Sequence, residues 1–163
     1  MYTVTKRALV ITVITLLIGI IAHASDSLIE YPAEYRNWTH IKSMIIQEGH
    51  PLHASFGGIH HIYANDKALQ GYQSGKFPDG SVIIFDLLES VESDNSITER
   101  KRKVLGIMKK DLQKFSNTAG WGFEGFGAGD PDNRVVGADY ETACFACHIS
   151  QKENDYVFSK WRE

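Results

Sequence analysis

The chain has 163 residues, a formal net charge of -3 and two cysteines. A chain of this length suits one domain with one hydrophobic core. Its mildly acidic balance argues against nucleic acids and anionic membranes as partners, because both bind basic surfaces. No repeat, low-complexity stretch or linker in the sequence suggests a second domain.

Residues 1–24 have the pattern of a secretory signal peptide. Two basic residues precede an apolar run over residues 8–21, and residues 22–24 form a small-x-small cleavage triplet. A helix over that run would span only about 21 Å, short of the roughly 30 Å hydrocarbon core of a bilayer. We therefore favour a signal peptide over an uncleaved anchor. Cleavage before Ser25 would leave residues 25–163 as one exported domain that is no longer attached to a membrane.

The middle of the chain has the composition of β-strands. Residues 38–46 and 59–64 are rich in aromatic and β-branched side chains, residues 81–88 are almost wholly apolar, and residues 103–109 supply a fourth candidate strand. Turn-forming residues separate these segments: Gly57-Gly58, Pro78-Asp79-Gly80 and Ser93-Asp94-Asn95. We expect the basic run at residues 100–103 to be a solvated strand entrance.

The helices are expected to be short. Residues 31–38 suggest a turn or two, and Asn65 can cap a helix that continues through Tyr72 and ends near Gly75. Another helix is expected to begin near Asp139. Long amphipathic helices of the kind that build a bundle are missing from the pattern. The predicted class is therefore α+β, a mainly antiparallel sheet with short helices.

The triplet Gly120, Gly122 and Gly125 matches the spacing of a dinucleotide-binding fingerprint. No predicted strand leads into it, and the glycine-rich residues that follow cannot begin the helix that such a site requires. We predict instead a fifth strand, with Trp121 and Phe123 among its large side chains. Its glycines would allow the close approach of core side chains or of a cofactor, and we favour core side chains.

Both cysteines lie in the pentapeptide Cys144-Phe145-Ala146-Cys147-His148. C-x-x-C-H is the attachment motif of a c-type haem, in which two thioethers hold the porphyrin and the histidine binds the iron. A thioredoxin-like redox pair is the alternative, but the βαβ pattern around such a pair is missing. We predict one covalent haem c, held by Cys144 and Cys147 on a C-terminal haem-binding helix, with His148 as axial ligand. Because c-type haem is attached outside the cytoplasm, the predicted location is the bacterial periplasm.

The other side of the iron decides what a haem protein does. The candidate ligands in the mature chain are Met44, Met108, His40, His50, His53, His60 and His61. Methionine within a strand is usually core filler. His60 and His61 are neighbours in a predicted strand and face opposite ways, so at most one of them faces the haem. The residues alone leave the sixth position open.

The mature chain resembles the cytochrome c′-beta and cytochrome P-460 family. The matching stretches are residues 31–38, 61–65, 75–82, 120–123 and 144–148. The resemblance implies a mainly antiparallel sheet, a haem near the C-terminus and a homodimer. In the cytochromes P-460 a lysine that follows the Asp-Gly-[Ser/Thr]-Val turn is cross-linked to the haem and supports hydroxylamine oxidation. Here Phe85 stands at that position, so the chain resembles the cytochrome c′-beta branch.

That branch closes its distal haem pocket with two phenylalanines, and the resemblance assigns these roles to Phe56 and Phe85. Two apolar rings over five-coordinate iron offer no sixth ligand and no hydrogen bond, which favours nitric oxide over dioxygen. Without the resemblance, both rings would be interpreted as plain core. We therefore expect a protein that binds nitric oxide for scavenging, sensing or transport. A small enzyme acting on hydroxylamine, nitric oxide or peroxide, and an electron carrier with an unidentified redox partner, stay as alternatives.

Overall fold

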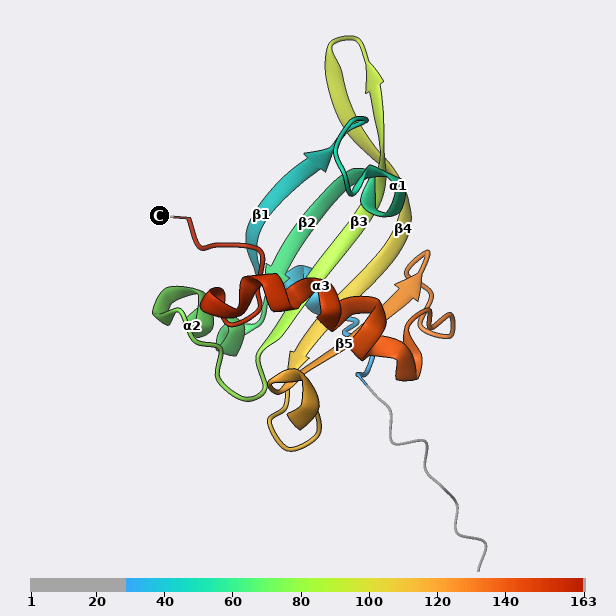
Figure 1. The fold of residues 1–163 in the computed structure, drawn as a ribbon. Helices are drawn as coiled ribbons and strands as arrows, with labels where there is room; N and C mark the ends of the chain where they lie inside the picture. Colours follow the sequence, from blue (N-terminus) through green and yellow to red (C-terminus); the bar gives the residue numbers. More distant parts are fainter. Residues whose placement is uncertain (1–28, 163) are drawn as a thin grey trace, which may run out of the picture.

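The computed structural model describes residues 29–162, which form a five-stranded antiparallel sheet flanked by short helices (Figure 1). Each strand pairs with its neighbours in the sequence, so the sheet is a simple meander. The strands are β1 (Thr39–Ile46), β2 (Gly58–Ala64), β3 (Val82–Ser93), β4 (Ser96–Lys110) and β5 (Trp121–Gly127). The predicted α+β class is confirmed. The predicted signal peptide lies outside the described residues.

The helices are short, as predicted. The α-helices are α1 (His53–Phe56), α2 (Asp66–Ser74) and α3 (Ala146–His148). Short segments of 3₁₀ or π helix occur at Tyr35–Asn37, Ser116–Thr118, Gly137–Asp139, Glu141–Phe145 and Ile149–Asn154. Within residues 29–162, no helix is long and apolar enough to cross a bilayer.

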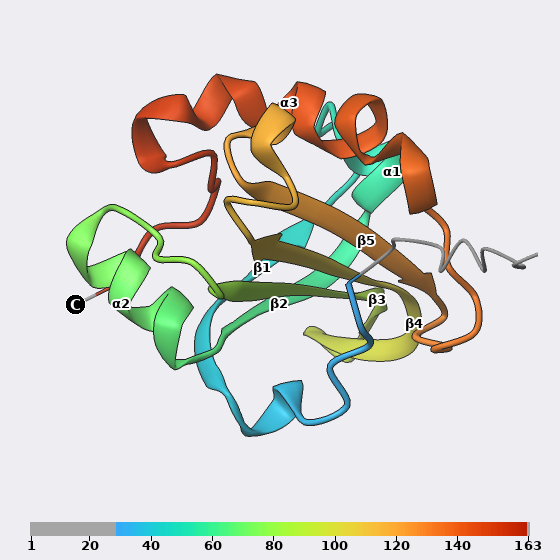
Figure 2. The ribbon, with the colours of Figure 1, turned by 90° about the horizontal axis from the view of Figure 1, so that it is seen from below.

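The two faces of the sheet carry separate hydrophobic cores. Figure 2 shows the C-terminal segment and α1 over one face, which we call the front face, and residues 29–37 against the other, the back face. Ile62, Ile83 and Phe123 belong to the front cluster, and Ile84, Leu105 and Phe126 to the back cluster. This alternation follows from strand geometry, in which successive side chains point to opposite faces. Any ligand held by the C-terminal segment therefore meets the front face.

Helix α2 has the caps that its sequence predicts. Asn65 Oδ1 accepts a hydrogen bond from the Ala68 N–H at 2.9 Å and a second from the Val82 N–H at 3.0 Å. Gly75 ends the helix in the left-handed conformation, with φ of 81°. One asparagine thus caps α2 and also fixes the start of β3.

The β3–β4 hairpin is longer than predicted. Asp94 and Asn95, with φ of 51° and 57°, form a two-residue turn between Ser93 and Ser96. The outer part of the hairpin is exposed and polar, so it lacks the apolar pattern of a strand. The basic run at residues 100–103 was predicted to be solvated, and this is wrong for Arg102. Its Nη2 donates a hydrogen bond to the Tyr35 hydroxyl at 2.8 Å, and its guanidinium forms an ion pair with a buried aspartate.

That aspartate, Asp86, is 1% exposed and lies on the back face. The Tyr35 hydroxyl donates a hydrogen bond to Asp86 Oδ2 at 2.6 Å, and burial followed by this bond raises the pKa of Tyr35 to about 12. Because consecutive side chains alternate in a strand, anchoring Asp86 at the back turns its neighbour Phe85 to the front.

The glycines of β5 allow close packing by core side chains. A Cβ on Gly122 would lie 2.2 Å from the Phe115 ring, and one on Gly125 would lie 2.8 Å from Val135. The segment is a strand, not the entry to a dinucleotide-binding helix. The preferred interpretation of this motif is confirmed.

Candidate haem site

The C-x-x-C-H motif lies in a run of short helical turns that crosses the front face (Figure 1). Cys144 is partly buried against the front cluster, Cys147 is exposed, and neither forms a disulfide. Burial, and then the nearby Glu124 carboxylate, raise the pKa of Cys144 to about 11. Redox dithiols usually have a lowered thiol pKa, so this environment argues against a thioredoxin-like pair.

His148 is held in the tautomer that a metal ligand requires. Its Nδ1 lies 2.7 Å from the Tyr156 carbonyl oxygen. Since a carbonyl can only accept, the proton sits on Nδ1 and Nε2 keeps a free lone pair. Burial lowers the pKa of His148, and the bond to Tyr156 opposes this shift. A neutral imidazole with its second nitrogen bound to a carbonyl is the usual arrangement of a metal-binding histidine.

The Tyr156 carbonyl is itself fixed by contacts that sequence reasoning missed. Asp155 and Tyr156 both have left-handed backbone conformations, with φ of 47° and 67°. The Asp155 carboxylate accepts a hydrogen bond from the Phe77 N–H at 2.9 Å and pairs with Lys110 Nζ at 2.8 Å. Trp121 Nε1 donates to the Asp155 carbonyl at 2.8 Å. Three separate parts of the fold therefore orient the acceptor of the His148 proton.

Aromatic rings surround His148. Its ring centroid lies 4.8 Å from that of Phe123 and 5.0 Å from that of Phe158. The ring centroid of Phe145, inside the motif, lies 5.1 Å from that of Tyr156. These rings give the histidine an apolar environment on the side of the C-terminal segment.

The two predicted distal phenylalanines lie together. Phe85 is in β3 and packs against the same front cluster as Cys144. Phe56 is the last residue of α1, and its ring meets Phe85 edge to face, with centroids 5.7 Å apart and an interplanar angle of 84°. Lys103 Nζ donates a hydrogen bond to the Gly57 carbonyl at 2.7 Å and so holds the end of α1 against β4. Phe56 is 40% exposed, which is unusual for plain core.

The candidate sixth ligands divide between the two faces. His60 is 5% exposed and lies on the front face, with its ring 4.5 Å from Phe85. His61 lies on the back face, where Ser43 Oγ is 2.6 Å from Nδ1 and Glu99 Oε1 is 3.0 Å from Nε2. The prediction that at most one of this pair could face the haem is therefore consistent with the fold. Burial, then the charges of His61 and Lys42, lower the pKa of His60 to about 4.

The other candidates are two methionines and three histidines. Met108 packs against the front cluster, as predicted for core filler. Met44 is 48% exposed, so the same prediction is wrong for Met44. His40 Nε2 lies 3.0 Å from Ser43 Oγ, beside His61. His50 Nδ1 accepts a hydrogen bond from the Leu52 N–H, and His53 begins α1.

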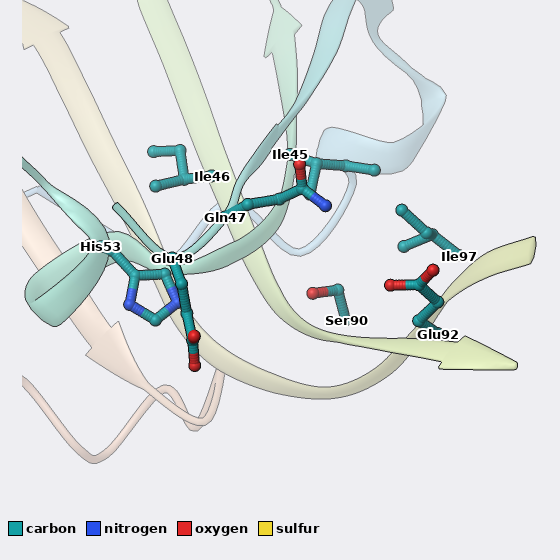
Figure 3. Close-up of a pocket in the computed structure, with 8 residues that line it drawn as sticks. All are labelled: Ile45, Ile46, Gln47, Glu48, His53, Ser90, Glu92 and Ile97. Carbon is teal, nitrogen blue, oxygen red and sulfur yellow. The ribbon is translucent and has the colours of Figure 1, made fainter. Parts of the chain in front are cut away.

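A hollow in the described part of the chain lies away from the motif. It has a volume of about 470 Å³ and lies between the end of β1 and the outer part of the β3–β4 hairpin (Figure 3). Its lining includes Ile46, His53 and Glu92, but neither the C-x-x-C-H residues nor Phe56 or Phe85. Within residues 29–162, no group of three or more histidine, cysteine, aspartate or glutamate side chains could hold a metal ion.

The chain matches the family model described as Cytochrome P460 over residues 32–159, which is most of its length. It therefore belongs to the cytochrome P460 family and is a haem protein of that family. No curated protein matches the chain. The described residues fit a haem: two unpaired thiols and a histidine with a free Nε2 lie on one segment, and this segment shares its face of the sheet with a pair of phenylalanine rings.

Proposed function

We propose that this protein is a periplasmic c-type cytochrome that binds nitric oxide at five-coordinate iron, in the manner of the cytochrome c′-beta branch. The observation that carries the proposal is the edge-to-face pair Phe56–Phe85 on the front face, which the haem motif also borders. Phe85 stands where the cross-linking lysine of a cytochrome P-460 would stand. The usual family homodimer and periplasmic export are parts of the same proposal.

Each residue has a defined part in the proposed site. Cys144 and Cys147 would bind the haem through thioethers, and His148 Nε2 would bind the iron while Nδ1 donates to Tyr156. The haem would supply a ferrous iron with one open position for a diatomic ligand. Phe56 and Phe85 would exclude water and larger ligands from that position. Neither ring can donate a hydrogen bond, so a ligand that depends on one gains little from them.

We expect the purified ferrous protein to have a high-spin, five-coordinate spectrum and to bind nitric oxide far more tightly than dioxygen. The optical spectrum of the reduced protein shows the coordination state of the iron. Titration with each gas under matched conditions measures the two affinities. A low-spin, six-coordinate ferrous spectrum would instead identify a second strong ligand and favour the electron carrier. Dioxygen binding as tight as that of nitric oxide would also contradict the proposal.

We expect one haem per chain, attached covalently through both cysteines. The intact mass of the denatured protein should equal that of residues 25–163 plus one haem, and acid–acetone should not extract the haem. Replacing both Cys144 and Cys147 with alanine should make the haem extractable while His148 stays available to bind it. Haem that acid–acetone removes from the unaltered protein would refute the thioether assignment.

A further inference from the structure

His60 is a buried imidazole whose Nδ1 has no polar partner in the part of the chain that the structure describes. It is 5% exposed, and Nδ1 is fully buried with no hydrogen-bond partner among residues 29–162. The strand register places Met44 opposite His60 on β1 and Leu87 opposite it on β3. Neither side chain offers a strong donor or acceptor. A buried polar group without a partner destabilises a fold, so its presence here needs an explanation.

The position of the ring connects His60 to the two phenylalanines. His60 pairs with Leu87 and is therefore a diagonal neighbour of Phe85 on the same face. The two ring planes are tilted by 35° with centroids 4.5 Å apart, and Phe85 in turn contacts Phe56. The three rings form one contiguous cluster with Phe85 at its centre. A displacement of Phe85 would therefore remove one of the side chains in contact with the imidazole.

We propose that His60 is a residue of the distal pocket, which donates a hydrogen bond to a small ligand that has entered past Phe85. This inference rests on the haem site proposed above and adds a selectivity role to it. The two phenylalanines restrict entry, and the imidazole behind them stabilises a ligand whose outer atom carries negative charge. One hydrogen bond is worth roughly a two- to tenfold gain in affinity, which narrows the preference for nitric oxide over dioxygen without reversing it. At neutral pH the ring is uncharged and carries one N–H, since its pKa lies near 4.

The experiment compares His60→Leu with His61→Leu in the haem-loaded protein. The two histidines are adjacent in β2 but face opposite sides of the sheet, so His61→Leu is a matched control. Carbon monoxide on the ferrous protein reports distal polarity through its stretching frequency, and cyanide on the ferric protein presents an anionic acceptor. We expect His60→Leu to raise the carbon monoxide frequency and to speed cyanide dissociation roughly two- to tenfold, the range for one hydrogen bond. His61→Leu should change neither.

A further pair of measurements separates this role from a purely structural one. His60→Gln keeps a side-chain N–H and should retain most of the slow cyanide dissociation. The melting temperature of His60→Leu should equal or exceed that of the unaltered protein, because an apolar side chain replaces an unpaired polar group. If His60→Leu does not fold, His60→Phe replaces it in the comparison.

Unchanged vibrational and cyanide data in a folded His60→Leu protein would overturn the inference, as would equal changes in His61→Leu. Either result would leave nitric oxide binding intact, so failure here is distinguishable from failure of the proposed function. A change from six- to five-coordinate iron on replacing His60 would also overturn it, because His60 would then be an iron ligand.

Discussion

Replacing Phe56 or Phe85 with alanine should speed the association of nitric oxide and carbon monoxide with the ferrous protein. The two rings meet edge to face at 5.7 Å, and a pair of this kind is worth about 0.5–1.5 kcal/mol beyond the area that it buries. If the pair must open before a ligand enters, removing it lowers the barrier by that amount. Association should then be about two- to tenfold faster. Stopped-flow mixing of each variant with either gas measures the rate.

A control variant must show that faster association does not come merely from a less stable fold. Truncating a buried phenylalanine costs roughly 3–5 kcal/mol, and Phe85 is the more buried of the two. Phe115→Ala removes a comparable ring from the back face, where the ring packs against Gly122. This variant should be destabilised without any change in association rate. If all three folded variants associate with the gases at the rate of the unaltered protein, Phe56 and Phe85 are structural core.

Local signals in the sequence were sufficient for most of the fold. The cap at Asn65 and the turn at Asp94-Asn95 need only residues within a few positions, and both are present as predicted. The four-residue helix α1 is too short to show a helical period, so it was not predicted. The outer part of the β3–β4 hairpin was missed because its strands are exposed on both faces and carry no apolar alternation.

In the candidate site, too, local features could be predicted from the sequence and long-range contacts could not. The C-x-x-C-H motif is contiguous, so five consecutive residues are enough to predict its chemistry. The proposed role of His60 depends instead on strand register. Only the pairing of β2 with β3 puts its ring beside Phe85 and leaves Nδ1 without a partner. The acceptor for His148 is a backbone carbonyl, which has no side-chain signature at all. Sequence patterns therefore predict which residues would bind the haem but carry no signal for those that orient them.

Replacing Phe85 with lysine should convert the site into one that can cross-link its haem. The front cluster around position 85 is apolar, so a lysine amine there would lose solvation and be deprotonated more readily, which makes it nucleophilic. Joining the amine to a haem ring carbon forms one N–C bond and breaks one N–H and one C–H bond. Two electrons and two protons leave, so the reaction needs an oxidant, and hydrogen peroxide can take them up as it forms water.

We therefore expect folded Phe85→Lys protein, loaded with haem and treated with peroxide, to yield a peptide in which residue 85 is bonded to the haem. Mass spectrometry of the digested protein detects it. Phe85→Met is the matched control, with a similar length and no amine, and should give no such peptide. The unaltered protein should also give none, since the nearby Lys67 donates a hydrogen bond from Nζ to the Asp79 carbonyl at 3.0 Å, away from Phe85. A folded, haem-loaded Phe85→Lys protein that forms no cross-link would show that position 85 does not face the haem edge. The distal role of both phenylalanines would then fail with it, because Phe56 is assigned to the pocket through its contact with Phe85.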